Sequence, residues 1–269
     1  MVIDGVRIDG DSGQAVLLLP GGAESCEGFF PGLSEGLLAD PGCRVIVHDR
    51  PGTGSSAEEG SLADAAAHLD ALIERLDCGP VVAVGQSLGG AVAALLARDH
   101  PDKVAGVVLL DATPINDPRA CARLERVMRV VGPLAGAPGL RRAFSAAVRG
   151  SMSRTLRRSD LRPDCAAAHA RIADTDIPTL ARSVRGIGRL SAGFSEQDLP
   201  RLPSAVVTAD RKPGDAIRRA HARLAYAFGA PLVCWPGATH SVHLDHPDDT
   251  LAVVRDVVSR VRAGERGSG

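Results

Sequence analysis

The residues best suited to chemistry surround Ser87. The segment Val81–Gly90 reads Val-Val-Ala-Val-Gly-Gln-Ser-Leu-Gly-Gly, an apolar run followed by Gly-x-Ser-x-Gly and then a helical pattern. Gly85 and Gly89 lack Cβ atoms where a strand would turn sharply into a helix, so the turn lifts the serine hydroxyl above the sheet. The N–H of Leu88, at the positive end of that helix, faces the place where an oxyanion would form. The pattern predicts a serine nucleophile for acyl transfer.

Short apolar runs separated by turn residues predict the strands that must position this serine. The runs are Ala15–Leu19, Val45–Val47, Val81–Val84, Val104–Leu110, Ala205–Val207 and Leu232–Trp235. Most of them do not alternate with polar residues, which is typical of parallel strands covered on both faces. Helical patterns lie between them, with the clearest apolar stripe over Leu62–Leu76. The alternation predicts an α/β fold with a doubly wound, mostly parallel sheet.

Residues 113–199 interrupt this alternation, because they contain no good strand run. They carry helical patterns separated by proline and glycine, namely Arg119–Val131, Leu140–Arg149, Asp164–Asp174 and Pro178–Leu190. This segment holds 15 Arg against 8 Asp plus Glu, a balance of about +7. We expect a core formed by residues 1–112 and 200–269 and a helical cap formed by residues 113–199.

Five motifs together resemble the α/β-hydrolase superfamily, and specifically its capped serine esterase-like members. They are Leu17-Leu18-Leu19-Pro20-Gly21-Gly22, Asp49-Arg50-Pro51-Gly52-Thr53-Gly54-Ser55, the serine turn, Leu109-Leu110-Asp111 and Gly237-Ala238-Thr239-His240. The resemblance covers nearly the whole chain. It is specific for the fold, and it leaves the substrate open. It implies an α/β-hydrolase fold with a catalytic triad and an oxyanion hole.

The resemblance also implies the base and the second oxyanion donor. The family's histidine lies between the last strand and the last helix, which favours His240 over His243 and His246. Gly22 would supply its N–H beside that of Leu88. Pro20 stands where the family usually has a histidine, a departure expected to affect orientation more than chemistry.

The acid that orients the histidine has two candidates. The family's usual place follows the strand Ala205–Val207, but the expected position near Lys212 holds a cation, and Asp210 is displaced toward the strand. Some members carry the acid after the preceding strand, where Asp111 stands. We favour Asp111, keep Asp210 as the alternative, and regard Asp49 as a poor third candidate within a structural turn.

Composition narrows the class of protein. The 269 residues are 45% hydrophobic and 23% charged, with a net charge of −1, which gives no electrostatic case for nucleic acid or a membrane. The amino-terminal residues do not resemble a signal peptide, and the longest apolar runs are far too short to cross a bilayer. The six cysteines lack metal-ligand spacing and are expected to be reduced thiols in the cytoplasm. No metal or other cofactor is predicted, and the sequence does not indicate an oligomeric state.

The predicted activity is a serine hydrolase acting on a small carboxylic ester, lactone or thioester. Hydrolysis of a carbon–carbon bond by the same triad is an alternative, and so is a non-catalytic ligand-binding or signalling protein on this scaffold. Dehalogenases and epoxide hydrolases of this fold need an aspartate nucleophile, whereas this chain has Ser87. Apolar residues of the helical segment could line a pocket: Leu124, Val127, Met128, Val131, Leu134, Leu140 and Phe144. Most of them are expected to pack on the core instead.

Overall fold

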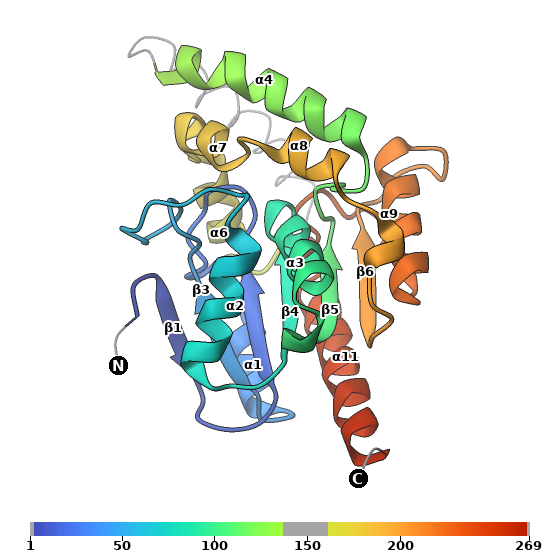
Figure 1. Cartoon of the computed structure of the whole chain (residues 1–269). Coiled ribbons are helices and arrows are strands. Elements are labelled where there is room, and N and C mark those ends of the chain that lie inside the picture. Colours follow the sequence, from blue (N-terminus) through green and yellow to red (C-terminus); the bar gives the residue numbers. More distant parts are fainter. Residues whose placement is uncertain (1–2, 137–160, 268–269) are drawn as a thin grey trace.

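The computed structural model describes residues 3–136 and 161–267, and within them a seven-stranded sheet forms the centre of the molecule (Figure 1). The strands are β1 (Val6–Asp9), β2 (Ala15–Leu19), β3 (Arg44–His48), β4 (Val81–Gln86), β5 (Val104–Leu110), β6 (Ser204–Thr208) and β7 (Leu232–Cys234). They are ordered β1-β3-β2-β4-β5-β6-β7, and only β1 runs antiparallel to its neighbour. The predicted fold class is confirmed.

Helices cover both faces of the sheet, which explains why the central strands are apolar throughout. Those of the sheet layer are α1 (Leu33–Ala39), α2 (Ala65–Leu76), α3 (Leu88–Asp99), α9 (Ala216–Phe228), α10 (Val242–Asp245) and α11 (Pro247–Gly267). Successive strand residues point to opposite faces. Leu17 and Leu109 therefore join the cluster formed with α2 and α3, while Leu18 and Val108 join the cluster formed with α11.

Four helices and a short 3₁₀ turn connect β5 to β6 among the described residues. They are α4 (Pro118–Gly136), α6 (Pro163–Ala173), α7 (Ile177–Ser183), α8 (Ile187–Ala192) and the turn Glu196–Asp198. Helix α4 contacts α7 and α8, and Figure 1 shows the three lying together beyond one end of the sheet. The predicted helix over Pro178–Leu190 is interrupted at Gly186, whose φ of 85° is left-handed. The predicted helix over Leu140–Arg149 lies outside the described residues.

Two further details differ from the sequence analysis. Strand β1 was not predicted, because its four residues, Val-Arg-Ile-Asp, are too short and too polar to form an apolar run. Helix α2 begins at Ala65 rather than at Leu62, although Leu62 still packs in the core. In the part of the chain that the structure describes, no helix is both long enough and apolar enough to cross a membrane.

Candidate active site

Ser87 lies at a tight turn between β4 and α3. Its backbone has φ 49° and ψ −117°, a conformation that residues other than glycine rarely adopt. A Cβ on Gly85 would lie 2.4 Å from the Gly89 carbonyl oxygen, and one on Gly89 would lie 2.1 Å from the Leu19 carbonyl oxygen. Only glycine fits where these backbones approach each other so closely, and the resulting turn presents the serine hydroxyl at the carboxyl end of the sheet.

His240 reaches this serine from the loop that follows β7. Its Nε2 lies 2.9 Å from Ser87 Oγ. Two interactions hold the loop: the side chain of Gln86 donates to the His240 carbonyl oxygen at 2.9 Å, and Thr239 donates to Asp245 from both its N–H and its hydroxyl, each at 2.6 Å. The backbone that carries the imidazole is thus held at His240 itself and at the preceding Thr239, while 56% of the His240 side chain remains exposed.

Asp111 lies on the other side of the imidazole. It directly follows β5 with φ 44°, is 1% exposed, and places Oδ2 2.6 Å from His240 Nδ1. The Ala209 N–H donates to Oδ1 at 2.9 Å, and the Arg211 guanidinium donates to both oxygens. Burial alone would raise the pKa of Asp111, but hydrogen bonds from His240 and Arg211 hold this pKa well below its usual range. The carboxyl group therefore stays ionised and can orient a protonated imidazole.

The other two candidate carboxylates have different partners. Asp210 is exposed and accepts a hydrogen bond from the Gly237 N–H at 2.9 Å, so it braces the loop that leads to His240. Asp49 accepts from the N–H groups of Cys26 and Ser55 at 2.5 and 2.7 Å. Of the three carboxylates considered from the sequence, the structure brings Asp111 to the imidazole and leaves the other two supporting loops.

The two backbone amides predicted as oxyanion donors belong to segments that adjoin the serine. Leu88 begins α3, and Gly22 belongs to the turn after β2, where the Arg50 side chain donates to the Gly22 carbonyl oxygen at 2.6 Å. A Cβ on Gly21 would lie 3.0 Å from Ser87 Cβ, so this turn passes directly beside the serine. Within residues 3–136 and 161–267, neither the Gly22 nor the Leu88 N–H donates to another group. Both therefore remain available to a negatively charged oxygen.

The other two histidines of the late segment have different partners. His243 is buried in α10 and stacks on Phe29 with ring centroids 4.8 Å apart, and burial lowers its pKa to about 3. His246 precedes α11 and contacts Asp249 at 3.1 Å. Neither one forms a hydrogen bond with Ser87 or Asp111.

Several residues that support the site were not predicted from the sequence. Arg211 binds Asp111, and Gln86 links the serine turn to the His240 loop. The fully buried His221 places its two ring nitrogens 2.9 Å from Thr208 Oγ1 and 2.7 Å from the Ala112 carbonyl oxygen. These contacts join residues far apart in the chain, so no local pattern could reveal them.

Comparison with known families places this fold and site in context. Residues 16–253 match the model of the Alpha/beta hydrolase family. This chain belongs to the α/β hydrolase family.

Relatives of this α/β hydrolase include several ester-cleaving proteins. It is 31% identical over 247 residues to a pimeloyl-[acyl-carrier protein] methyl ester esterase of Aromatoleum aromaticum, covering 81% of this chain and 88% of that protein. It is 30% identical over 110 residues to the sn-1-specific diacylglycerol lipase ABHD11 of Mus musculus, covering 40% of this chain and 36% of the lipase. A solved thermophilic esterase of Thermogutta terrifontis has a TM-score of 0.74 at 22% identity, covering 95% and 93% of the two chains, and shares the fold.

A cavity of about 280 Å³ opens beside the serine of this hydrolase. Ser87, His240, Asp111 and Arg211 lie along it. Its other lining residues are small or apolar: Ala112, Thr113, Pro114, Ala120, Cys121, Leu124 and Ile217. Helix α4 therefore contributes one wall of the cavity. This wall includes Leu124, which is one of the predicted pocket residues.

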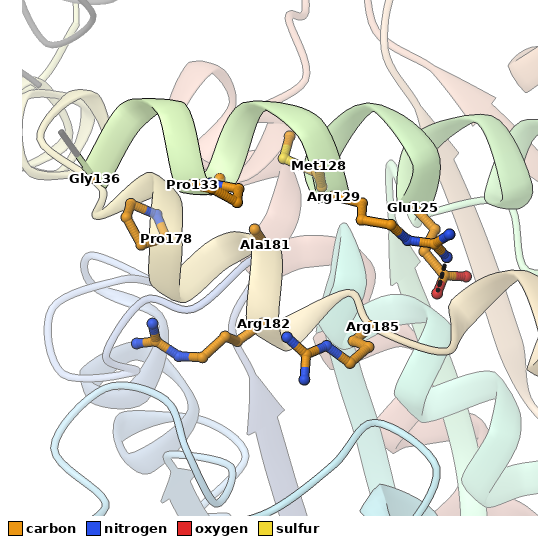
Figure 2. A pocket seen from close by; sticks show the side chains of 10 residues that line it. Glu125, Met128, Arg129, Pro133, Gly136, Pro178, Ala181, Arg182 and Arg185 are labelled. Carbon is orange, nitrogen blue, oxygen red and sulfur yellow. Dashed lines mark hydrogen bonds and ion pairs between the residues drawn. The ribbon is translucent and has the colours of Figure 1, made fainter. Parts of the chain in front are cut away.

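A second cavity, of about 400 Å³, lies between α4 and α7, away from the serine (Figure 2). Its apolar lining includes Met128, Pro133 and Ala181, with Arg182 and Arg185 on one side. Of the other predicted pocket residues, Val127 and Leu134 are about half exposed, at 47% and 51%. Leu140 and Phe144 lie outside the described residues.

Proposed function

We propose that this α/β hydrolase cleaves a small carboxylic ester, lactone or thioester through an acyl-enzyme. The main support for this proposal is a series of short contacts that link Ser87 Oγ to His240 and His240 to Asp111, beside a largely apolar cavity. A nucleophile, a base and an orienting carboxylate at hydrogen-bond distances are the groups that acyl transfer requires. At about 280 Å³ the cavity lies at the small end of ligand pockets, which span roughly 300–1,000 Å³, and this favours small acyl or alkoxy groups.

In the first half of the reaction, Ser87 Oγ attacks the carbonyl carbon and its proton passes to His240 Nε2. The carbonyl oxygen becomes an oxyanion that accepts hydrogen bonds from the Leu88 and Gly22 N–H groups. Asp111 stabilises the imidazolium through Nδ1. When the tetrahedral intermediate collapses, the bond to the leaving group breaks, and His240 returns the proton to the departing alcohol or thiol.

In the second half, a water molecule attacks the acyl-enzyme and gives its proton to the same imidazole. The bond between the acyl carbon and Ser87 Oγ then breaks, the serine regains its proton, and a carboxylic acid is released. Each oxyanion donor contributes roughly 10²–10³ in rate, and the base roughly 10²–10⁴.

We propose that residues 113–199 act as a cap over this chemistry. Pro114, Ala120, Cys121 and Leu124, all from this segment, form a wall of the serine cavity. A wall built from one insertion makes the acyl or alcohol specificity depend on that insertion rather than on the sheet.

The test is turnover of p-nitrophenyl acetate and butyrate, with covalent labelling by a fluorophosphonate. We expect Ser87→Ala to abolish both, since among the described residues only the Ser87 hydroxyl is hydrogen-bonded to the imidazole. Ser61→Ala is the matched control, because Ser61 is an exposed serine bound to Asp64, and it should keep full turnover and labelling. Labelling or turnover that survives in Ser87→Ala contradicts the mechanism. Wild-type protein with neither activity favours the non-catalytic binding alternative.

A further inference from the structure

Arg211 forms an ion pair with Asp111, the carboxylate that also contacts His240. It follows β6, and its guanidinium donates to both carboxylate oxygens, with Nη2 2.7 Å from Oδ2. The Arg211 side chain is 19% exposed and Asp111 is 1% exposed, so the ion pair is largely removed from water. A bidentate arginine fixes the plane of the carboxylate as well as its position.

The same carboxylate oxygen contacts both the guanidinium and the imidazole. Asp111 Oδ2 is 2.7 Å from Arg211 Nη2 and 2.6 Å from His240 Nδ1, so the two nitrogens lie within about 5 Å of each other. Arg211 therefore acts on the imidazole in two ways. It neutralises part of the carboxylate charge that favours imidazolium, and its own positive charge opposes protonation of His240 directly.

We propose that Arg211 is a positioning residue that holds the Asp111 carboxylate in the plane of His240 and lowers the basicity of that imidazole. The inference rests on the proposed function, because it assigns a second partner to the same triad. Its consequence is a base that stays neutral, and so able to accept the serine proton, at lower pH than an ordinary Asp–His pair would allow.

Other titratable and charged groups near His240 do not supply this effect. His221 from α9 and His243 from α10 are buried, and burial lowers the pKa of each by disfavouring the charged form of the ring. Asp210 and Asp245 accept hydrogen bonds from the loop backbone just before His240, at Gly237 and Thr239. Among the described residues, Arg211 is the permanent cation in contact with the triad carboxylate.

The experiment compares Arg211→Gln with wild type in two readouts. The first is the pH profile of kcat/KM for p-nitrophenyl butyrate, and the second is the NMR titration of the His240 imidazole. Removing the guanidinium takes one positive charge away from beside the triad, so the acidic limb of the profile should move upward by about one pH unit. Well below both limbs this is a roughly tenfold extra loss in kcat/KM. A merely structural role would lower activity at every pH without moving the limb.

Two further variants serve as controls. Arg223→Gln removes an arginine paired with Glu196 on the exposed side of α9, and it should leave the limb and the NMR titration unchanged. Arg211→Lys keeps the charge with fewer donors, so kcat should fall while the limb stays within about 0.3 pH unit of wild type. Circular dichroism checks that each variant is folded.

The outcomes separate this inference from the proposed function. If the Arg211→Gln limb and His240 titration coincide with wild type, the inference is overturned. If Arg211→Gln does not fold, an Arg211→Lys limb displaced by a full unit overturns it instead. If wild type has no turnover that depends on Ser87, the proposed function fails, and the NMR titration still tests the effect of Arg211 on His240.

Discussion

Replacement of Asp111 by asparagine tests the arrangement of the site most directly. The side chain keeps its size and loses its charge, and the effect depends on which carboxylate position the amide nitrogen occupies. The Oδ1 position accepts donors from Ala209 N–H and Arg211, so the amide oxygen is expected to occupy it. The amide nitrogen then takes the Oδ2 position, 2.6 Å from His240 Nδ1.

This orientation has a specific chemical consequence. An amide N–H pointing at Nδ1 forces that nitrogen to be an acceptor, so the imidazole proton moves to Nε2. Nε2 then presents a hydrogen to Ser87 Oγ and cannot remove the serine proton. We expect kcat/KM to fall by about 10³–10⁴, which corresponds to roughly 4–5.5 kcal/mol of transition-state stabilisation. Loss of the anion opposite the largely buried Arg211 should also lower the free energy of unfolding by about 2–3 kcal/mol.

Asp210→Asn is the matched comparison, since it makes the same substitution one strand away. Its side chain is exposed and accepts one hydrogen bond from Gly237, which an amide oxygen can still accept. We expect kcat/KM to stay within about threefold of wild type. The assay is steady-state hydrolysis of p-nitrophenyl butyrate, with urea unfolding to show that each variant is folded. Equal losses in the two variants, or a loss below tenfold for Asp111→Asn, would refute the assignment of the acid.

Two further predictions concern the turn beside the serine and a buried histidine. A Cβ in Gly21→Ala would lie 2.1 Å from the Gln86 side-chain oxygen and 3.0 Å from Ser87 Cβ, so kcat/KM should fall at least about tenfold. Gly214→Ala, where no atom lies within 4 Å of the added Cβ, should be neutral in the same assay. Burial lowers the pKa of His243 to about 3 in the folded protein, whereas the unfolded chain binds a proton below about 6.5. The free energy of unfolding should therefore decrease by about 2 kcal/mol between pH 6.5 and 5 from this group, and urea titrations at the two pH values should show this share missing in His243→Leu.

The sheet and the serine turn were predictable because both are encoded locally. Six apolar runs coincide with six of the seven observed strands, and the glycines around Ser87 indicate a bend that only glycine permits. A strand that is buried on both faces has a continuous apolar run, and such a run is recognisable in the sequence. Strand β1 lacks that mark because it lies at the sheet edge and is partly exposed.

The partners of the serine were harder to predict because they depend on contacts across long stretches of chain. Asp111 and His240 lie 129 residues apart, and Arg211 and Asp111 lie 100 residues apart. Nothing in the local sequence distinguishes an aspartate that meets an imidazole from one that caps a loop. Position relative to the strands narrowed the acid to Asp111 or Asp210 and favoured Asp111, and the coordinates bring Asp111 to the imidazole.

The geometry of the sheet allows the proposed acid to stand after β5 instead of after β6. Strands β5 and β6 are parallel neighbours, so their carboxyl ends lie at the same edge, roughly 4.8 Å apart. A carboxylate that follows β5 instead of β6 therefore starts about one strand spacing further from the usual position of the acid. The backbone of Asp111, with a left-handed φ of 44°, can turn its side chain back toward that position. The loop after β6 then no longer needs an acid. In this chain it provides Arg211, which faces the carboxylate from the vacated side and holds it toward His240. The departure of residues 210–212 from the family pattern and the placement of Asp111 are therefore two parts of one arrangement, and a change at either position should be felt at the imidazole.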